Sequence, residues 1–176
     1  MNKHRAVRIN FSGLAMILIA GALATGLLLV THGTNAFAQS NNDSNCTVTP
    51  PDAKAMLVYE IGNPVPECQL TDLGHPANLG GQVLEGDVRI SARVDFAQNG
   101  MLAGVFQATR GRVLITFPFN EHATIITGSV KLTDELGQSH TYHPGDSYFI
   151  RQGSKILWEV AGRRVQKSFF NYTTPQ

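Results

Sequence analysis

The stretch DVRISARVDFAQNGMLAGVFQATRGRVLITF, residues 87–117, decides the fold class of this chain. Apolar and polar residues alternate from Val88 to Phe96, which is the period of a strand with one buried face. Asn99-Gly100 follows, a dipeptide typical of a tight hairpin turn. Residues 101–108 then read as the return strand, and residues 112–117 as the next one. The sequence therefore predicts a β-hairpin at the start of the folded domain.

The segments downstream of this hairpin repeat its pattern of short strands separated by turn residues. Turns are predicted at Asp134–Gly137, at Pro144–Asp146 and at Arg151–Gly153. The strands expected around them are 122–127, 130–133, 139–142, 147–150, 156–160 and 165–172. Short strands with frequent turns indicate an all-β sandwich or barrel, which we expect over residues 82–174.

The segment upstream, residues 39–81, is expected to be an irregular N-terminal arm. It begins as a polar stretch that ends in Pro50-Pro51, and several further Pro and Gly residues follow. Ala53 to Ile61 is mildly apolar and is a candidate edge strand. No part of the arm has the apolar periodicity of a helix.

Residues 1–38 have the organisation of a secretory signal peptide. Lys3, Arg5 and Arg8 precede an apolar run at 11–30, and Ala36-Phe37-Ala38 fits the small-x-small cleavage pattern. The alternative is an uncleaved membrane anchor formed by residues 11–30, since this run is long enough to span a bilayer. Both interpretations place the folded domain outside the cytoplasm, in the periplasm or secreted.

The net charge bears on possible partners, and the cysteine content predicts a covalent link. Removal of Lys3, Arg5 and Arg8 leaves 11 basic against 13 acidic residues, a net charge of −2 with no basic stripe, so we expect no nucleic-acid partner. Cys46 and Cys68 are the two cysteines of the chain. In an oxidising compartment an even count predicts a disulfide, worth about 3 kcal/mol for a loop of this length. A redox-active pair is the weaker alternative because such pairs lie closer together.

The second half of the chain resembles the cupin superfamily, and within it the family named after ureidoglycine aminohydrolase. The resemblance rests on the combination of a Glu-x6-Gly spacing, a Pro-Gly-Asp turn and a Trp-bearing strand after a glycine turn. The matching segments are GVFQATRGRV (104–113), EHATIITGSVKLTDELGQ (121–138), HPGDSYFI (143–150) and ILWEV (156–160). The resemblance implies a jelly-roll β-barrel.

The metal ligands of such a cupin are largely missing from this sequence. Glu121 and Gly128 keep the Glu-x6-Gly spacing, but the three imidazole positions hold no histidine. These positions fall at Ile115 and Phe117, or in the other register at Leu114 and Thr116, and at Ile156. One carboxylate cannot hold a transition metal, which needs several converging N or O ligands. We therefore expect neither a metal nor another cofactor.

The residues left around this position are the candidate site. Glu121 is the candidate general acid or base if it lies inside the barrel, and a solvated strand-edge residue if it does not. A buried Glu121 needs a donor, for which Lys167 or a nearby Tyr is expected. Trp158, Tyr142, Tyr148 and Lys167 are the candidate ligand-binding residues, with core packing as the alternative for Trp158. We expect Glu121→Gln to leave the fold intact and to abolish any function of the barrel interior.

Three functions are compatible with these residues. The first is an exported, metal-free cupin that binds a small polar or aromatic ligand. The second is a metal-independent isomerase or lyase, or an aminohydrolase-like enzyme, that uses Glu121. The third is a structural domain that pairs as a homodimer through a face of its barrel. The sequence does not identify the ligand.

Overall fold

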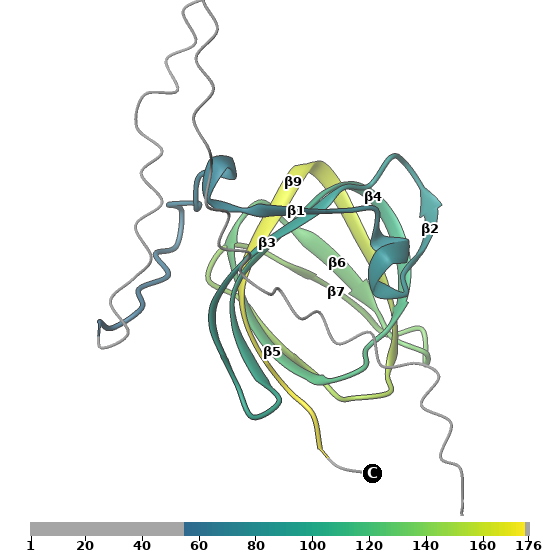
Figure 1. The fold of residues 1–176 in the computed structure, drawn as a ribbon. Helices are drawn as coiled ribbons and strands as arrows, with labels where there is room; N and C mark the ends of the chain where they lie inside the picture. The colour runs from purple at the N-terminus through teal and green to yellow at the C-terminus, as the bar shows by residue number, and fades with distance from the viewer. Residues whose placement is uncertain (1–54, 175–176) are drawn as a thin grey trace, which may run out of the picture. The chain divides into compact units, whose positions relative to one another are not determined.

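The computed structural model describes residues 55–174, which form nine strands and two short 3₁₀ helices (Figure 1). No helix in this part of the chain is long and apolar enough to cross a membrane. The elements are η1 Glu67–Gln69, β1 Thr71–Gly74, η2 Pro76–Leu79, β2 Gln82–Glu85, β3 Ile90–Gln98, β4 Met101–Thr116, β5 Asn120–Thr127, β6 Val130–Thr133, β7 Ser139–Tyr142, β8 Ser147–Ile150 and β9 Lys155–Tyr172. The predicted all-β jelly-roll barrel is confirmed.

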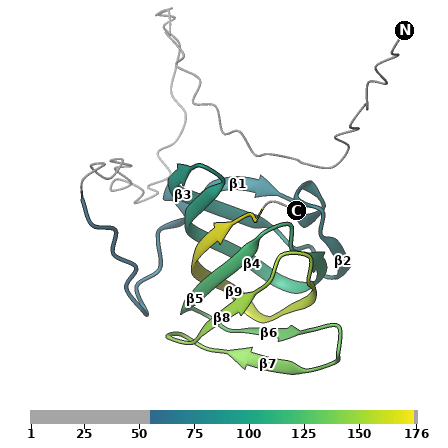
Figure 2. The same ribbon diagram turned by 90° about the horizontal axis from the view of Figure 1, so that it is seen from below.

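Two long strands, β4 and β9, hold the barrel together. They pair with each other along nearly their whole length, from Met101 opposite Tyr172 to Thr116 opposite Lys155. The first half of β4 also pairs with β3 and its second half with β2, while β9 pairs with β6 and then with β5 (Figure 2). Each long strand thus pairs on both of its sides, and all nine strands belong to one continuous sheet that forms the barrel wall.

This continuity differs from the sequence-based expectation. Residues 101–108 and 112–117 were expected as two strands, and so were 156–160 and 165–172, but each pair is one bent strand. The bend in β4 lies at Gly111, which has φ 144°. A Cβ there would lie 2.4 Å from Cγ2 of Val88 and 2.5 Å from the carbonyl oxygen of Glu85. The glycine therefore marks a bulge inside a strand and not a turn between two strands.

The hairpin turn is as expected, because Asn99 and Gly100 both have positive φ, at 51° and 76°. The single buried face predicted for residues 88–96 holds only in part. Val88, Ile90 and Ala92 are buried, whereas Val94 and Phe96 are 36% and 38% exposed. The register of β3 against β4 shifts between Val94 and Phe96, which turns Phe96 to the outer face of the sheet.

The N-terminal arm contains more regular secondary structure than expected. Residues 71–74 form β1, which pairs with β3, whereas the candidate edge strand at Ala53–Ile61 is wrong for its described part, residues 55–61. The arm docks on the outer face of β9 through Gln166, which is completely buried. Its side chain accepts from Val65 N at 2.9 Å and donates to Val65 O at 2.7 Å. It also donates to Gln107 Oε1 at 3.0 Å.

Two sequence-based predictions on the N-terminal part concern residues outside the described range. The signal peptide at 1–38 is one of them. The Cys46–Cys68 disulfide is the other, because only Cys68, within η1, belongs to residues 55–174. Both stay predictions.

The docking of the arm can be tested by replacing Gln166 with leucine. The substitution removes three hydrogen bonds and leaves Val65 N–H and C=O under the arm without their partner. An unpaired buried polar group costs about 1–3 kcal/mol, so we expect Gln166→Leu to lower the free energy of unfolding by about 3 kcal/mol in urea denaturation. Gln82→Leu, at an exposed position of β2, is the control and should change it by less than about 0.5 kcal/mol. Equal stability of the two variants would contradict the docking role.

Candidate functional site: a buried charge cluster in the barrel

The positions at which a metal-binding cupin would carry its imidazoles are part of the hydrocarbon core in this chain. Ile115 and Ile156 are direct cross-strand partners on β4 and β9. Phe117 and Ile156 are buried in the main core cluster, and Ile115 packs against it, whereas Thr116 of the other register is exposed. Within residues 55–174 no three His, Cys, Asp or Glu side chains come together as a metal site would require. A transition metal would find only one carboxylate here, which does not fit the ligand set it needs.

That carboxylate, Glu121 of β5, forms an ion pair with Lys167 inside the barrel. Glu121 and Lys167 are each only 3% exposed, and Lys167 Nζ donates a short hydrogen bond to Glu121 Oε1. Tyr148 OH donates to the same oxygen at 3.0 Å and accepts from Lys167 Nζ at 2.9 Å. Asn171, with its amide nitrogen turned to the carboxylate, donates to Glu121 Oε2 at 3.2 Å. The donors expected for a buried Glu121 are therefore present.

Sheet register explains how these residues meet. Lys167 on β9 lies between Phe106 of β4 and Ile125 of β5. On the other side of β5, Tyr148 of β8 is opposite Ala123, two residues from Glu121 on the same strand face. Adjacent strands are about 4.8 Å apart, a distance that the long side chains of Lys167 and Tyr148 bridge readily. Three strands thus bring their charged or polar groups to a common point, with β9 contributing both Lys167 and Asn171.

Aromatic rings enclose the lysine ammonium. Lys167 Nζ lies 4.7 Å from the ring centre of Trp158, 5.2 Å from that of Phe106 and 5.4 Å from that of Tyr148. A cation within about 6 Å of a ring centre is attracted by the ring's quadrupole. Phe106 and Asn171 were not among the sequence-predicted site residues. Their positions opposite Lys167 and Glu121 follow from strand register, which the sequence pattern alone does not give.

The cluster has spare hydrogen-bond donors but few spare acceptors. Trp158 is buried and its Nε1–H has no hydrogen-bond partner. The ammonium of Lys167 has three N–H groups, of which two are used by Glu121 and Tyr148. Both oxygens of Glu121 already accept hydrogen bonds. A group entering this space would therefore be recognised by its accepting oxygen or nitrogen atoms.

Burial changes the acid–base properties of the cluster. Desolvation lowers the pKa of Lys167 from its ordinary 10.5, and the negative charge and hydrogen bond of Glu121 oppose this effect. The unfolded chain thus holds this proton to higher pH than the folded protein, so the stability contribution of Lys167 improves as the pH rises toward 10.5. Desolvation, followed by the charge and the hydrogen bond of Glu121, raises the pKa of Tyr148, which stays a donor at neutral pH.

The remaining candidate, Tyr142, lies between the cluster and solvent. It is half-buried on β7, a strand that pairs only with β6, and its ring centre is 5.2 Å from that of Tyr148. The ring centre of the exposed His140 lies 4.5 Å from that of Tyr142. His122 points to the outer face, as expected for the neighbour of an inward Glu121. All five sequence-predicted residues around the barrel interior thus adjoin one another, with Tyr142 nearest the surface.

The buried Lys167 revises one expectation from the sequence. Glu121→Gln was expected to leave the fold intact, but it removes the only anion that contacts the Lys167 ammonium among the described residues. Removing one partner of a buried ion pair costs about 3–5 kcal/mol, because the other charge is left uncompensated. The lowered pKa of Lys167 offsets part of this cost, since the amine can lose its proton.

A double-mutant cycle tests the pair. We expect Lys167→Met to lower the free energy of unfolding by about 3–5 kcal/mol, and the double variant Lys167→Met with Glu121→Leu to recover most of that loss, because neither charge then remains buried alone. The control is Lys131→Met, which breaks a surface ion pair with Glu159 and should cost at most about 1 kcal/mol. Additive effects of the two barrel substitutions in chemical denaturation would show that the pair is not coupled.

Known proteins resemble this chain at the level of the barrel. Residues 97–169 match the sequence model of the EutQ-like cupin domain, and no curated protein matches the chain. A protein of unknown function from Pseudomonas syringae pv. tomato has a similar structure, with 24% sequence identity and a TM-score of 0.52 over 58% of this chain and 43% of that one. The EutQ protein of Clostridium difficile is 18% identical, with a TM-score of 0.48 over 65% of this chain and 83% of that one.

The likeness to the Pseudomonas syringae protein, at 24% identity, shows a shared fold and not a shared activity. The finer resemblance to the ureidoglycine aminohydrolase family stays a prediction. The β-sheet topology, the match over residues 97–169 and the similar solved structure agree on one point. The domain that this chain folds into is a jelly-roll barrel of the cupin type, and its residues 97–169 are similar to the EutQ-like cupin domain.

Proposed function

We propose that this protein is an exported, metal-free cupin domain that binds a small polar or aromatic ligand in its barrel. The observation that carries the proposal is the Glu121–Lys167–Tyr148 cluster, buried against aromatic rings beside an unpaired indole N–H. Binding pockets are mostly apolar with a few convergent polar groups, and this cluster has that composition.

Energetics support a functional reason for the cluster. A buried ion pair is rarely the most stable solution, because hydrocarbon side chains of similar volume often stabilise a core better. The core around the cluster consists of hydrocarbon and aromatic side chains, with the buried Asn171 as a further polar member of the cluster. Glu121 is the one carboxylate that a metal cupin would use as a ligand. The ammonium of Lys167 contacts it and balances its negative charge without a metal.

Access to the cluster is expected beside β7. This strand is at the edge of its sheet, and three of its four residues are exposed. Movement of Tyr142 away from Tyr148 would open a path from the exposed His140 to the rings around Lys167. Edge strands have fewer backbone hydrogen bonds to break than central ones.

The single tryptophan provides a direct test. Trp158 is the only one in the chain, so intrinsic fluorescence reports on the barrel interior. In a titration with benzoate, benzamide, benzylamine and benzyl alcohol, we expect a saturable change with at least one compound. Lys167→Met should weaken that binding at least tenfold, whereas Lys155→Met, at an exposed position of β9, should not. The proposal fails if no compound binds and mass spectrometry finds no small molecule that co-purifies with the protein.

An enzymatic function is the first alternative. It would be a metal-independent isomerase or lyase, or an aminohydrolase-like enzyme. The lowered pKa of Lys167 favours a role in proton transfer, because its ammonium gives up a proton more readily than that of an ordinary lysine. Glu121, which accepts three hydrogen bonds, would then act mainly by holding Lys167 and Tyr148.

Pairing of two copies is a second candidate, favoured by a row of aromatic side chains on the outer face. Phe96, Ala103, Phe170, His122 and Phe149 are successive cross-strand neighbours over β3, β4, β9, β5 and β8. The three phenylalanines are 38%, 39% and 51% exposed along this row. An apolar face of this kind suits a self-complementary contact between two copies.

Light scattering during size-exclusion chromatography tests this pairing. We expect the wild-type domain to elute as a dimer and the double variant Phe149→Ser with Phe170→Ser as a monomer, because the aromatic row loses two of its three rings. Leu136→Ser is the control, since Leu136 is 82% exposed but lies in the turn between β6 and β7. A monomeric wild-type domain at 100 μM (roughly tenfold above the concentrations at which weak dimers form) would exclude this candidate.

A further inference from the structure

A second site lies on the outside of the barrel, where β4 and β9 separate. A surface cavity of about 490 Å³ opens there, within the size range of small-molecule sites. Asp87 of the β2–β3 loop, Arg110 and Arg112 of β4, and Glu159 and Arg163 of β9 are among its lining residues. None of the groups of the barrel cluster lines it.

The cavity exists because the sheet pairing is interrupted. Thr109 pairs with Arg164, and Gly111 pairs with Val160, so Arg110 alone faces residues 161–163. These residues have no cross-strand partner in the β4–β9 ladder. Their backbone N–H and C=O groups therefore make no hydrogen bonds within that ladder and are candidates for hydrogen bonds to a ligand.

At the two glycines that line the cavity, Gly86 and Gly111, backbone segments approach each other closely. Gly111 leaves no room for a side chain, because a Cβ there would meet Glu85 O at 2.5 Å. Gly86 has φ 83°, and a Cβ there would lie 3.1 Å from Arg110 O. Glycines at such positions allow two backbone segments to approach each other closely.

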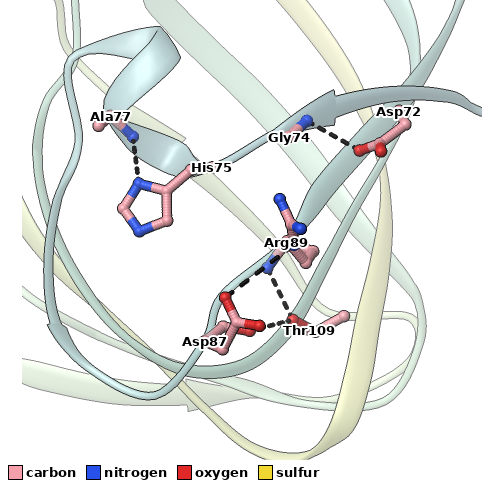
Figure 3. A network of polar contacts seen from close by, with 7 residues as sticks. All are labelled: Asp72, Gly74, His75, Ala77, Asp87, Arg89 and Thr109. Atoms are coloured by element: carbon pink, nitrogen blue, oxygen red, sulfur yellow. Dashed lines mark hydrogen bonds and ion pairs between the residues drawn. The ribbon is translucent and has the colours of Figure 1, made fainter.

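The adjoining loop is fixed by hydrogen bonds (Figure 3). Arg89 N donates to Thr109 Oγ1 at 2.8 Å, and the same hydroxyl lies 3.5 Å from Asp87 O. The side chains of Arg89 and Asp87 form a long ion pair at 4.0 Å. These contacts join the β2–β3 loop to β4 beside the bulge, so this side of the cavity is preformed.

The charges around the cavity favour an anion. Each acidic lining residue faces a base: Asp87 faces Arg89, Glu85 faces Arg112, and Glu159 faces both Arg112 and Lys131. Arg110 and Arg163 also line the cavity, and neither makes an ion pair with another described residue. Counting these partners, five basic groups meet three acidic ones.

We infer that this cavity binds a small organic anion, a carboxylate or phosphate compound, through the guanidinium groups of Arg110 and Arg163. Guanidinium groups form paired hydrogen bonds with such oxyanions, and backbone N–H groups outside the β4–β9 ladder can add to their recognition. The site is separate from the barrel interior and does not depend on the proposed function of Glu121 and Lys167.

Isothermal titration calorimetry of the exported protein at low ionic strength tests the inference, with citrate and inorganic phosphate as probes. We expect at least one probe to bind, and Arg110→Gln and Arg163→Gln each to raise its Kd at least tenfold. Arg151→Gln, at an exposed position in the β8–β9 turn, is the matched control and should change the Kd less than twofold. Lys167→Met should leave this Kd unchanged in folded protein.

Two outcomes would overturn the inference. One is the absence of binding of both probes to the wild-type protein. The other is binding that survives both Arg110→Gln and Arg163→Gln, since the anion would then lie elsewhere. Loss of binding in Lys167→Met with retention in the arginine variants would assign the anion to the barrel and thus separate the two sites.

Discussion

The antiparallel pairing of β4 with β9 is the constraint on which the other features of this domain depend. Each of the two strands also pairs with two further strands, so their ladder is the centre of the single nine-stranded sheet. The pairing places Phe106 beside Lys167 and Val113 beside Trp158. On the outer face it places Gln107 beside Gln166, which receives the N-terminal arm. The interruption of the same ladder at Arg110 produces the surface cavity.

Inside the barrel, the electrostatic problem is a buried carboxylate that needs a compensating charge. Glu121 keeps the position and spacing of a metal ligand, while its expected imidazole neighbours are hydrocarbon side chains. An isolated buried carboxylate would be costly or would take up a proton. Lys167 and Tyr148 provide the compensating charge and hydrogen bonds, and the rings of Trp158 and Phe106 shield the ammonium from water. The arrangement is a polar centre that needs no bound ion for its charge balance.

Sequence reasoning reached the fold because alternation and turn residues are local signals. It placed the Asn99-Gly100 hairpin and most strands, and it expected Lys167 or a nearby Tyr as the donor to a buried Glu121, of which the structure has both Lys167 and Tyr148. It divided β4 and β9 into shorter strands, because a glycine at a bulge has the same local composition as a turn. It missed Phe106, Asn171 and the docking by Gln166, because cross-strand register brings these residues to their partners. Cross-strand register depends on the whole sheet, so it cannot be predicted from the sequence pattern of a single strand.

Register also fixes which polar residue serves which purpose. Gln166 and Lys167 are neighbours on β9 and both are buried, yet one faces the arm and the other faces Glu121. A slip of one residue would exchange them, since successive side chains of a strand point to opposite faces. The ammonium would then lie under the arm against Val65, and Glu121 would lose its cation. Both misplacements would leave buried polar groups unpaired, so the arm outside and the ion pair inside together select one register of the central strand.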